Sequence, residues 1–161
     1  MTKPLALVKP ATRHLSHTGT VLVDSGPLMA LFNAADHWHA RVPAGLQSNT
    51  TAALFSTWPV ATEACALLPR RIHNDCASDF LRWAQRGGIT LHGAAGGSVT
   101  DMLRIAGRFS ELPFDLADAS IAETAGRLRL RLRLRHVLSM NADFDVYRDR
   151  WGRPLINLLR S

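Results

Sequence analysis

The sequence predicts an α/β fold of three layers, α/β/α, in which helices cover both faces of a central, mostly parallel sheet. Short apolar runs are typical of buried strands, and the amphipathic stretches between them are typical of helices. Strands that alternate with helices of this length indicate a parallel sheet. With 161 residues, 47% of them hydrophobic, the chain can bury the core of one domain and is short for two.

The N-terminal third contains two predicted strands and the helices between them. The apolar run at 21–23 predicts a buried strand, and Pro27 shortly after it predicts the start of a helix. Asp36 is a suitable N-cap for a second helix that continues through Val42. A weaker strand is expected at 52–55.

Proline and glycine mark the ends of the next two helices. Pro59 predicts the start of the first, and Pro69 predicts its end, because proline lacks the amide hydrogen that continues a helix. The following helix carries Phe80 and Trp83 among its apolar residues and ends at Gly87, the first of two glycines.

The second half of the chain continues the alternation of strands and helices. A short strand is expected at 89–91, then a helix at 98–112 and another from Asp118 to about residue 131. The segment RLRLRLRLRH is ambiguous, because its alternation has the period of a strand although it continues a helical pattern. We divide it, so that the helix ends near residue 131 and a buried strand begins near residue 134.

The chain is strongly basic. It has 19 Lys and Arg against 13 Asp and Glu, a net charge of +6 and a pI near 10.6, and nearly all of its basic residues are Arg. Because guanidinium groups match the geometry of phosphates, this balance favours a polyanionic partner, with nucleic acid first. A charge that only keeps the protein in solution explains the composition equally well.

Residues 1–18 are basic, contain two prolines and are predicted to be a flexible leader ahead of one domain at 19–161. Their longest apolar run is too short for a signal sequence, and no later stretch approaches the length of a membrane span. Cys65 and Cys76 have neither the spacing of a zinc site nor the number of a disulfide framework. A reducing, cytoplasmic location is therefore expected.

Four acids that are distant in the sequence stand at strand ends or on the apolar faces of predicted helices: Asp24, Glu63, Asp118 and Asp143. Strand ends are where parallel sheets bind ligands, and a charge on an apolar face is costly without a partner. Taken singly, each position also has an ordinary structural explanation. Asp24 then caps the next helix, and Glu63 forms a buried ion pair with an Arg. Together, such carboxylates repel one another unless a hard cation such as Mg2+ or Mn2+ lies among them. With a basic surface, they indicate metal-assisted hydrolysis of phosphodiesters.

A fifth acid, Asp115, lies one helical turn before Asp118. It falls outside the apolar stripe, so we expect it to support the start of the helix or to make an outer, water-mediated contact with the site.

Four segments in a characteristic order carry a family resemblance: VLVDSGPLMALFNAADHWH, TWPVATEACALL, LPFDLADASIAETAGRL and HVLSMNADFDVYR. Over about residues 20–158 the chain resembles PIN-domain ribonucleases, and among them the VapC-type toxins of bacterial toxin-antitoxin pairs. The acidic quartet of that family falls on the four acids named above. Ser25 and Ser139 match its auxiliary polar positions, and Asn141 stands where many relatives have Asp.

The resemblance implies a PIN-like fold and a Mg2+- or Mn2+-dependent endoribonuclease toxin that hydrolyses phosphodiester bonds in structured RNA, such as tRNA or rRNA. It implies that Asp24, Glu63 and Asp118 hold the metal and that Asp143 completes the site. It further implies a homodimer and a small antitoxin protein that inhibits the toxin with an Arg-bearing tail. Two other functions stay open: a PIN-fold nuclease in RNA processing, and a catalytically silent RNA-binding module, which the uncharged Asn141 also suits.

Overall fold

A computed structural model gives the structure of the chain and describes residues 19–47, 53–132, 134–149 and 151–160. The predicted leader at 1–18 lies outside the described residues. The helices and strands, in chain order, are β1 (Thr20–Val23), α1 (Ser25–Phe32), α2 (Arg41–Gln47), β2 (Ala53–Thr57), α3 (Trp58–Arg71), α4 (Cys76–Gln85), β3 (Thr90–His92), α5 (Ser98–Arg108), α6 (Leu116–Leu132), β4 (His136–Leu138), the short 3-10 helix η1 (Ala142–Asp145) and β5 (Ile156–Asn157). Within these ranges no helix is long and apolar enough to cross a membrane.

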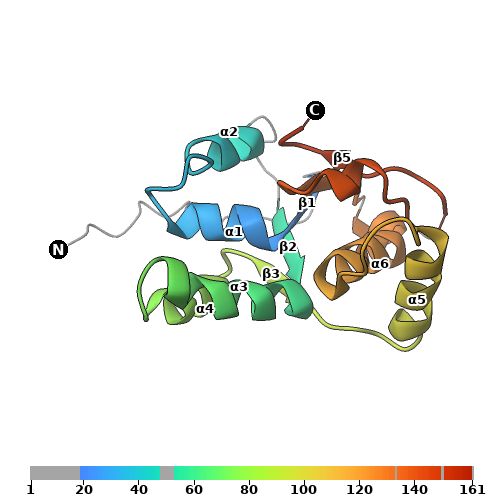
Figure 1. Cartoon of the computed structure of the whole chain (residues 1–161), viewed down its shortest axis with the longest axis horizontal. Coiled ribbons are helices and arrows are strands. Elements are labelled where there is room, and N and C mark those ends of the chain that lie inside the picture. Colours follow the sequence, from blue (N-terminus) through green and yellow to red (C-terminus); the bar gives the residue numbers. More distant parts are fainter. Residues whose placement is uncertain (1–18, 48–52, 133, 150, 161) are drawn as a thin grey trace.

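The five strands form one parallel sheet in the order β3-β2-β1-β4-β5. From β1 the chain moves outward through β2 to β3, and it then crosses to the other side of β1 to form β4 and β5. Because parallel crossovers are right-handed, the helices before and after this reversal cover opposite faces of the sheet. Figure 1 shows α1, α3 and α4 on one side of the strands and α5 and α6 on the other. The predicted three-layer α/β/α fold is confirmed.

The central strand β1 places the candidate site. All four of its residues are buried, and its Val23 pairs in register with Leu138 of β4. The strand order reverses between β1 and β4, and such a switch point leaves a crevice beyond the carboxyl ends of the strands. Asp24 follows β1 directly and Ser139 follows β4 directly, so the two side chains start from adjacent positions at this crevice.

The core on the α6 face depends on small side chains. Ala117, Ala122 and Ala125 are buried on α6 together with Ile121, and α6 packs against α3, β1 and β2. Small residues let the helix lie close to the sheet, and the burial of apolar surface stabilises this arrangement by roughly 25 cal/mol per Å2. The packing fixes where the first turn of α6, with Asp118, meets the ends of the strands.

Several helices begin or end at other residues than the sequence predicts; α6 begins at Leu116, before Asp118, and α5 ends at Arg108, before residue 112. α1 begins at Ser25, before Pro27, because the Asp24 carboxylate caps it by accepting a hydrogen bond from the Ser25 amide at 2.7 Å. Proline fits the first turn, where amides have no helical partner. The helix predicted after Asp36 is wrong over its first residues, since Asp36 closes a turn by accepting from the Trp38 amide at 2.8 Å and α2 begins only at Arg41.

Proline also fails to end α3. The helix passes Pro69 and continues to Arg71. A proline in the last turn removes only the hydrogen bond to the carbonyl four residues earlier, so the helix can finish its turn before it stops. At the other end, Pro59 lies in the first turn as predicted, and the Thr57 hydroxyl caps the helix by accepting from the Val60 amide.

The strands are shifted by one to two residues from their predicted positions. β2 and β3 end later than expected, β4 begins two residues later than expected, and residue 52 lies outside the described part of the chain. β5 was not predicted, because two residues show no periodicity. It forms because the chain after η1 returns to the free edge of β4, where His136 and Val137 pair with it.

The Arg-Leu segment is helical as far as α6 extends, and its first arginine ties two elements together. Arg127 donates to the buried carboxylate of Glu123 at 2.8 Å and to the carbonyl of Gly93 at 3.1 Å. The same carboxylate accepts from the Ser98 hydroxyl at the start of α5. These bonds fasten the loop before α5 to α6, which accounts for Arg127 without a nucleic-acid contact.

The next arginine of the run forms a buried ion pair. Arg129 donates to Asp149 at 2.7 Å, and the Asp149 side chain is completely buried. The other carboxylate oxygen of Asp149 accepts from the backbone amides of Trp151 and Arg153. The pair thus anchors the C-terminal segment that leads to β5.

We predict that Asp149→Ala lowers the free energy of unfolding by about 3 to 5 kcal/mol, because it leaves Arg129 without its counter-charge in a largely buried position. The control is Asp79→Ala, which removes an exposed pair with Arg82 and should cost less than about 1 kcal/mol. Urea unfolding followed by circular dichroism measures both. Equal losses in the two variants would contradict the anchoring role of Asp149.

Candidate functional site

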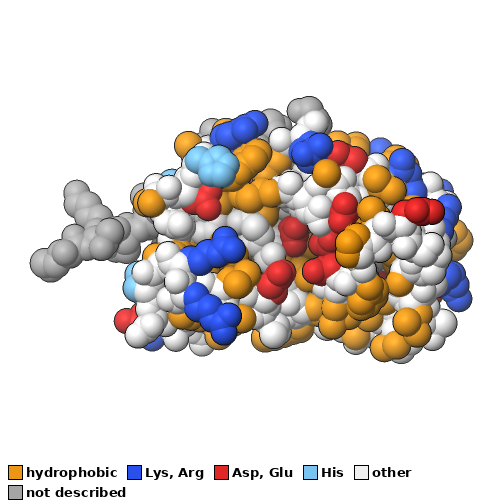
Figure 2. Space-filling model, in the orientation of Figure 1, with side chains coloured by type: hydrophobic (Ala, Val, Ile, Leu, Met, Phe, Trp, Pro, Cys, Tyr) orange, Lys and Arg blue, Asp and Glu red, His pale blue; other side chains and the backbone are white. Residues whose placement is uncertain are grey.

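Carboxylates gather on one face of the molecule, beyond the carboxyl ends of β1 and β4. Figure 2 shows Asp and Glu side chains near the middle of this face, between the α3 side and the α6 side. The predicted site residues come from four places in the chain: the end of β1, α3, the start of α6 and the segment from β4 into η1. Hydrogen bonds through Ser139 and Asn141 connect three of them, Asp24, Asp118 and Asp143.

Asp24 is buried and held by two donors. One oxygen accepts from the Ser25 amide at 2.7 Å and the other from the Ser139 hydroxyl at 2.7 Å. Burial raises the pKa of Asp24 above its usual value, the two hydrogen bonds oppose this rise, and the charges of Glu63 and Asp115 add to it. Both serines predicted as auxiliary residues therefore contact the same carboxylate.

Asp118, in the first turn of α6, faces the same space. Its side chain is buried, and one of its oxygens accepts from the Asn141 amide at 2.8 Å. Burial raises the pKa of Asp118 to about 7, with further contributions from the charges of Asp24, Asp115 and Asp143, while the bond from Asn141 opposes the rise. Mutual effects of this kind require the carboxylates to lie near one another.

Asp115 caps the helix that carries Asp118. One of its carboxylate oxygens accepts from the Asp118 amide at 3.0 Å, and its carbonyl accepts from the Ala119 amide at 3.0 Å. Asp115 itself is exposed. This is the helix-start support that the sequence predicts, and the charge of Asp115 still reaches Asp24 and Asp118.

Asp143 and Asn141 belong to the short segment after β4. The Asn141 side chain caps η1 by accepting from the Asp143 amide at 3.0 Å, and its amide group donates to the Asp143 carboxylate at 3.3 Å. Asn141 thus touches Asp118 and Asp143 at once. Its own backbone amide donates to Ser139, which connects this turn to Asp24.

Glu63 lies on α3 and is half-buried. Its charge raises the pKa of Asp24, which places it on the same side of the site. Among the residues that the structure describes, Glu63 forms no ion pair with an arginine, so this alternative explanation of Glu63 finds no support.

Two residues of this region were not found from the sequence. Tyr147, the single tyrosine of the chain, is buried, and its pKa is raised to about 12 by burial and then by the charges of Asp118, Asp143 and Asp115. Asn157 on β5 accepts from the Ser139 amide at 3.3 Å, and its own buried side-chain amide nitrogen has no hydrogen-bond partner among the described residues. Tyr147 lies only four residues after Asp143, and this proximity in the sequence could have indicated it. No feature of the sequence indicates Asn157.

The donor set suits a hard divalent cation by its chemistry. It consists of oxygen atoms only, and burial, together with the charges of neighbouring carboxylates, raises the pKa values of Asp24 and Asp118. Over the described ranges, however, no group of three His, Cys, Asp or Glu side chains is already arranged to hold one ion. The amide of Asn141 lies between two of these carboxylates and donates to both.

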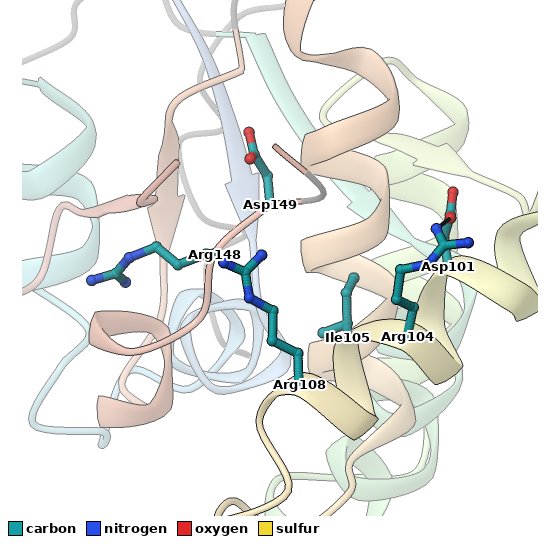
Figure 3. A pocket seen from close by; sticks show the side chains of 6 residues that line it. All are labelled: Asp101, Arg104, Ile105, Arg108, Arg148 and Asp149. Carbon is teal, nitrogen blue, oxygen red and sulfur yellow. Dashed lines mark hydrogen bonds and ion pairs between the residues drawn. The ribbon is translucent and has the colours of Figure 1, made fainter. Parts of the chain in front are cut away.

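A separate small pocket lies between α5 and the C-terminal segment, lined by Asp101, Arg104, Ile105, Arg108, Arg148 and Asp149 (Figure 3). Its volume of about 30 Å3 has room for little more than a water molecule. In Figure 3 the Arg148 side chain points away from Arg108, and Arg148 donates to the carbonyls of residues 145–147. The pocket includes none of the predicted site residues, and we assign it no role.

We predict that the metal-free protein becomes less stable as the pH rises from 3.8 to about 7. The pKa of Asp118 is about 7 in the folded protein and 3.8 in the unfolded chain, so in this range the folded state holds the proton more strongly. Ionisation then favours unfolding. Melting temperatures in EDTA should fall with pH, and Asp118→Asn should flatten the profile; identical slopes in the two proteins would contradict the assignment.

We further predict that Ser139→Ala raises the pKa of Asp24, because it removes a hydrogen bond to the ionised carboxylate. Carbon-13 NMR of the labelled carboxyl group, in the metal-free protein, measures the shift. The matched control is Ser98→Ala, a buried serine that donates to a different carboxylate, Glu123. An Asp24 titration unchanged by Ser139→Ala would show that the hydroxyl does not stabilise this carboxylate.

No protein-family model matches the chain, and no curated protein sequence matches it significantly. Solved structures do. VapC20 of Mycobacterium tuberculosis, described as a sarcin-ricin loop cleaving toxin, superposes with a TM-score of 0.65 at 17% identity, over 78% of this chain and 93% of that chain. A chain of VapBC2 from Rickettsia felis, solved bound to a DNA fragment from its promoter, gives a TM-score of 0.60 at 11% identity, over 86% of this chain and 98% of that one.

At these identities the likeness concerns the fold. The superpositions cover nearly the whole of each neighbour. The chain therefore has the fold of the VapC toxins, the PIN fold that its sequence motifs predict.

Proposed function

We propose that the protein is a Mg2+- or Mn2+-dependent endoribonuclease toxin of a toxin-antitoxin pair, which hydrolyses phosphodiester bonds in structured RNA such as tRNA or rRNA. The observation that carries the proposal is the meeting of Asp24, Asp118 and Asp143 at the switch point of the sheet, on a chain with net charge +6. VapC20, which has this fold, is described as cleaving the sarcin-ricin loop, and this supports an RNA substrate.

In this proposal Asp24, Glu63 and Asp118 hold the cation and Asp143 completes the site. The cation supplies activation of a water molecule and neutralises charge that develops on the phosphate oxygens. Ser25 and Ser139 orient the Asp24 carboxylate and keep both of its oxygens in fixed positions. Asp115 fixes the first turn of α6 and thereby the place of Asp118.

Tyr147 has a part that needs no ionisation. Its pKa of about 12 keeps the hydroxyl protonated at neutral pH. The ring is buried and packs against Phe109 and Phe144, so Tyr147 supports the structure beside the acids and does not act as a base.

The proposed partners are a small antitoxin protein and a second copy of the chain. The VapBC2 neighbour is a complex of two proteins, which supports an antitoxin. Large apolar side chains on the surface suit protein contacts, and four of them lie on α5 and around the start of α6: Val99, Leu103, Phe114 and Leu116. Both cysteines are free, in keeping with a reducing, cytoplasmic location.

A catalytically silent RNA-binding module is the second candidate, and one observation favours it. The Asn141 amide already bridges Asp118 and Asp143, so these acids are satisfied without a cation. Such a module would bind RNA in a salt-dependent manner and would cleave none with any divalent ion. A PIN-fold nuclease in RNA processing is distinguished by a genome neighbourhood that lacks a small antitoxin gene upstream.

We predict that Asp118→Asn reduces RNA cleavage in Mg2+ or Mn2+ by at least about 100-fold, as loss of a group that stabilises the transition state does. Asp115→Asn should reduce it by about tenfold, because Asp115 acts on the site through the helix start. The measurement is single-turnover cleavage of labelled tRNA and rRNA fragments by the purified protein.

The matched control for this experiment is Asp79→Asn, the same substitution at an exposed acid on α4, which should leave cleavage unchanged. Equal and complete loss in the Asp118 and Asp115 variants would contradict the division of roles. Absence of cleavage by the unaltered protein with both ions, together with tight RNA binding, would favour the silent module.

A further inference from the structure

The Asn141 side chain makes three hydrogen bonds within the acidic site. Its amide nitrogen lies 2.8 Å from a carboxylate oxygen of Asp118 and 3.3 Å from one of Asp143. Its carbonyl oxygen accepts from the Asp143 backbone amide at 3.0 Å. One uncharged side chain thus links two of the four acids that are proposed to hold the cation.

The orientation of this amide is determined by its neighbours. The backbone amide of Asp143 can only donate, so it requires the carbonyl oxygen of Asn141. With the oxygen fixed in this way, the amide nitrogen faces Asp118 and Asp143 and donates to one carboxylate oxygen of each. A flipped side chain would lose all three bonds, and the amide hydrogens are therefore held toward the carboxylates.

Held in this way, the neutral amide stabilises the two carboxylates by donating hydrogen bonds to them, a role that a cation could also have. The amide directs its hydrogens at one carboxylate oxygen of Asp118 and one of Asp143, both of which belong to the proposed ligand set. A cation that took either of these oxygens as a ligand would compete with the amide for it.

We propose that Asn141 is a positioning residue that competes with the divalent cation: its amide holds Asp118 and Asp143 together in the metal-free protein and is displaced when the ion binds. The inference rests on the metal site of the proposed function. It makes Asn141 a determinant of metal affinity, so that the site fills only when the ion is abundant. A residue that merely supported the site would have the opposite effect, since its loss would weaken metal binding.

Two substitutions separate these possibilities. Asn141→Ser keeps a side-chain oxygen that can cap η1 but removes the amide hydrogens. Asn141→Asp keeps the shape and the cap but replaces the donor by a charged acceptor. The matched control is Asn33→Ser, because the Asn33 side chain closes the same kind of local turn, accepting from the amide two residues on, Ala35, at 3.1 Å, at the end of α1 remote from Asp24.

The measurement is Mn2+ binding to the purified full chain by isothermal titration calorimetry, without RNA. We expect Asn141→Ser to bind Mn2+ about tenfold more tightly than the unaltered protein, because hydrogen bonds to charged groups no longer have to be broken. Asn141→Asp should bind at least as tightly as Asn141→Ser and should have a lower melting temperature in EDTA, since it adds a third repelling carboxylate. Asn33→Ser should change neither the Mn2+ affinity nor the melting temperature in EDTA.

Each other result decides the question. Binding to Asn141→Ser that is equal to or weaker than that of the unaltered protein overturns the competition and leaves the metal site intact. If Mn2+ binds to the two Asn141 variants and not to the unaltered protein, the proposed competition is supported in its strongest form. Failure of all these proteins to bind Mn2+ overturns both this inference and the metal dependence of the proposed function. If Asn141→Ser does not fold, NMR of the unaltered protein replaces it, with the side-chain amide signals of Asn141 followed as Mg2+ is added. A change of these signals on saturation with Mg2+ supports displacement of the amide, and unchanged signals overturn it.

Discussion

Repulsion among the carboxylates at the ends of β1 and β4 is the constraint that the surrounding structure meets with neutral hydrogen-bond donors. Ser25 and Ser139 donate to Asp24, and Asn141 donates to Asp118 and Asp143. None of these donors carries a charge, so the site is stabilised without being neutralised. Burial, and then the charges of Asp24, Asp115 and Asp143, raise the pKa of Asp118 to about 7. A site in this condition attracts cations, whether metal ions or guanidinium groups.

The parallel sheet is what brings the acids together, and this part of the structure was accessible from the sequence. A buried strand followed by Asp24, and an apolar helix face that includes Asp118, are local patterns that tertiary packing does not alter. The contacts that hold the acids were not accessible. The place of Asn157 beside Ser139 depends on β5, a strand of two residues, and the turn at Asp36 depends on a side-chain hydrogen bond that competes with the helix signal.

The basic composition of the chain overstates the charge that its surface offers to RNA. Arg127 and Arg129 bind acids of the core, and Arg148 binds backbone carbonyls at the end of η1. Of the Arg-Leu segment, Arg131 and Arg135 are exposed, and residue 133 lies outside the described ranges. A net charge read from sequence does not distinguish these uses, because an internal ion pair and a phosphate contact require the same residue. The exposed arginines are the candidates for guiding RNA to the acids.

The central claim is that the carboxylates at this switch point bind a divalent cation. Its most direct test is a crystal structure of the protein grown with Mn2+, with anomalous differences collected near the manganese absorption edge. A peak between Asp24 and Asp118, with the Asn141 amide moved away from Asp118, is the expected result. A site without an anomalous peak at saturating Mn2+, with the Asn141 bridge intact, would contradict the claim.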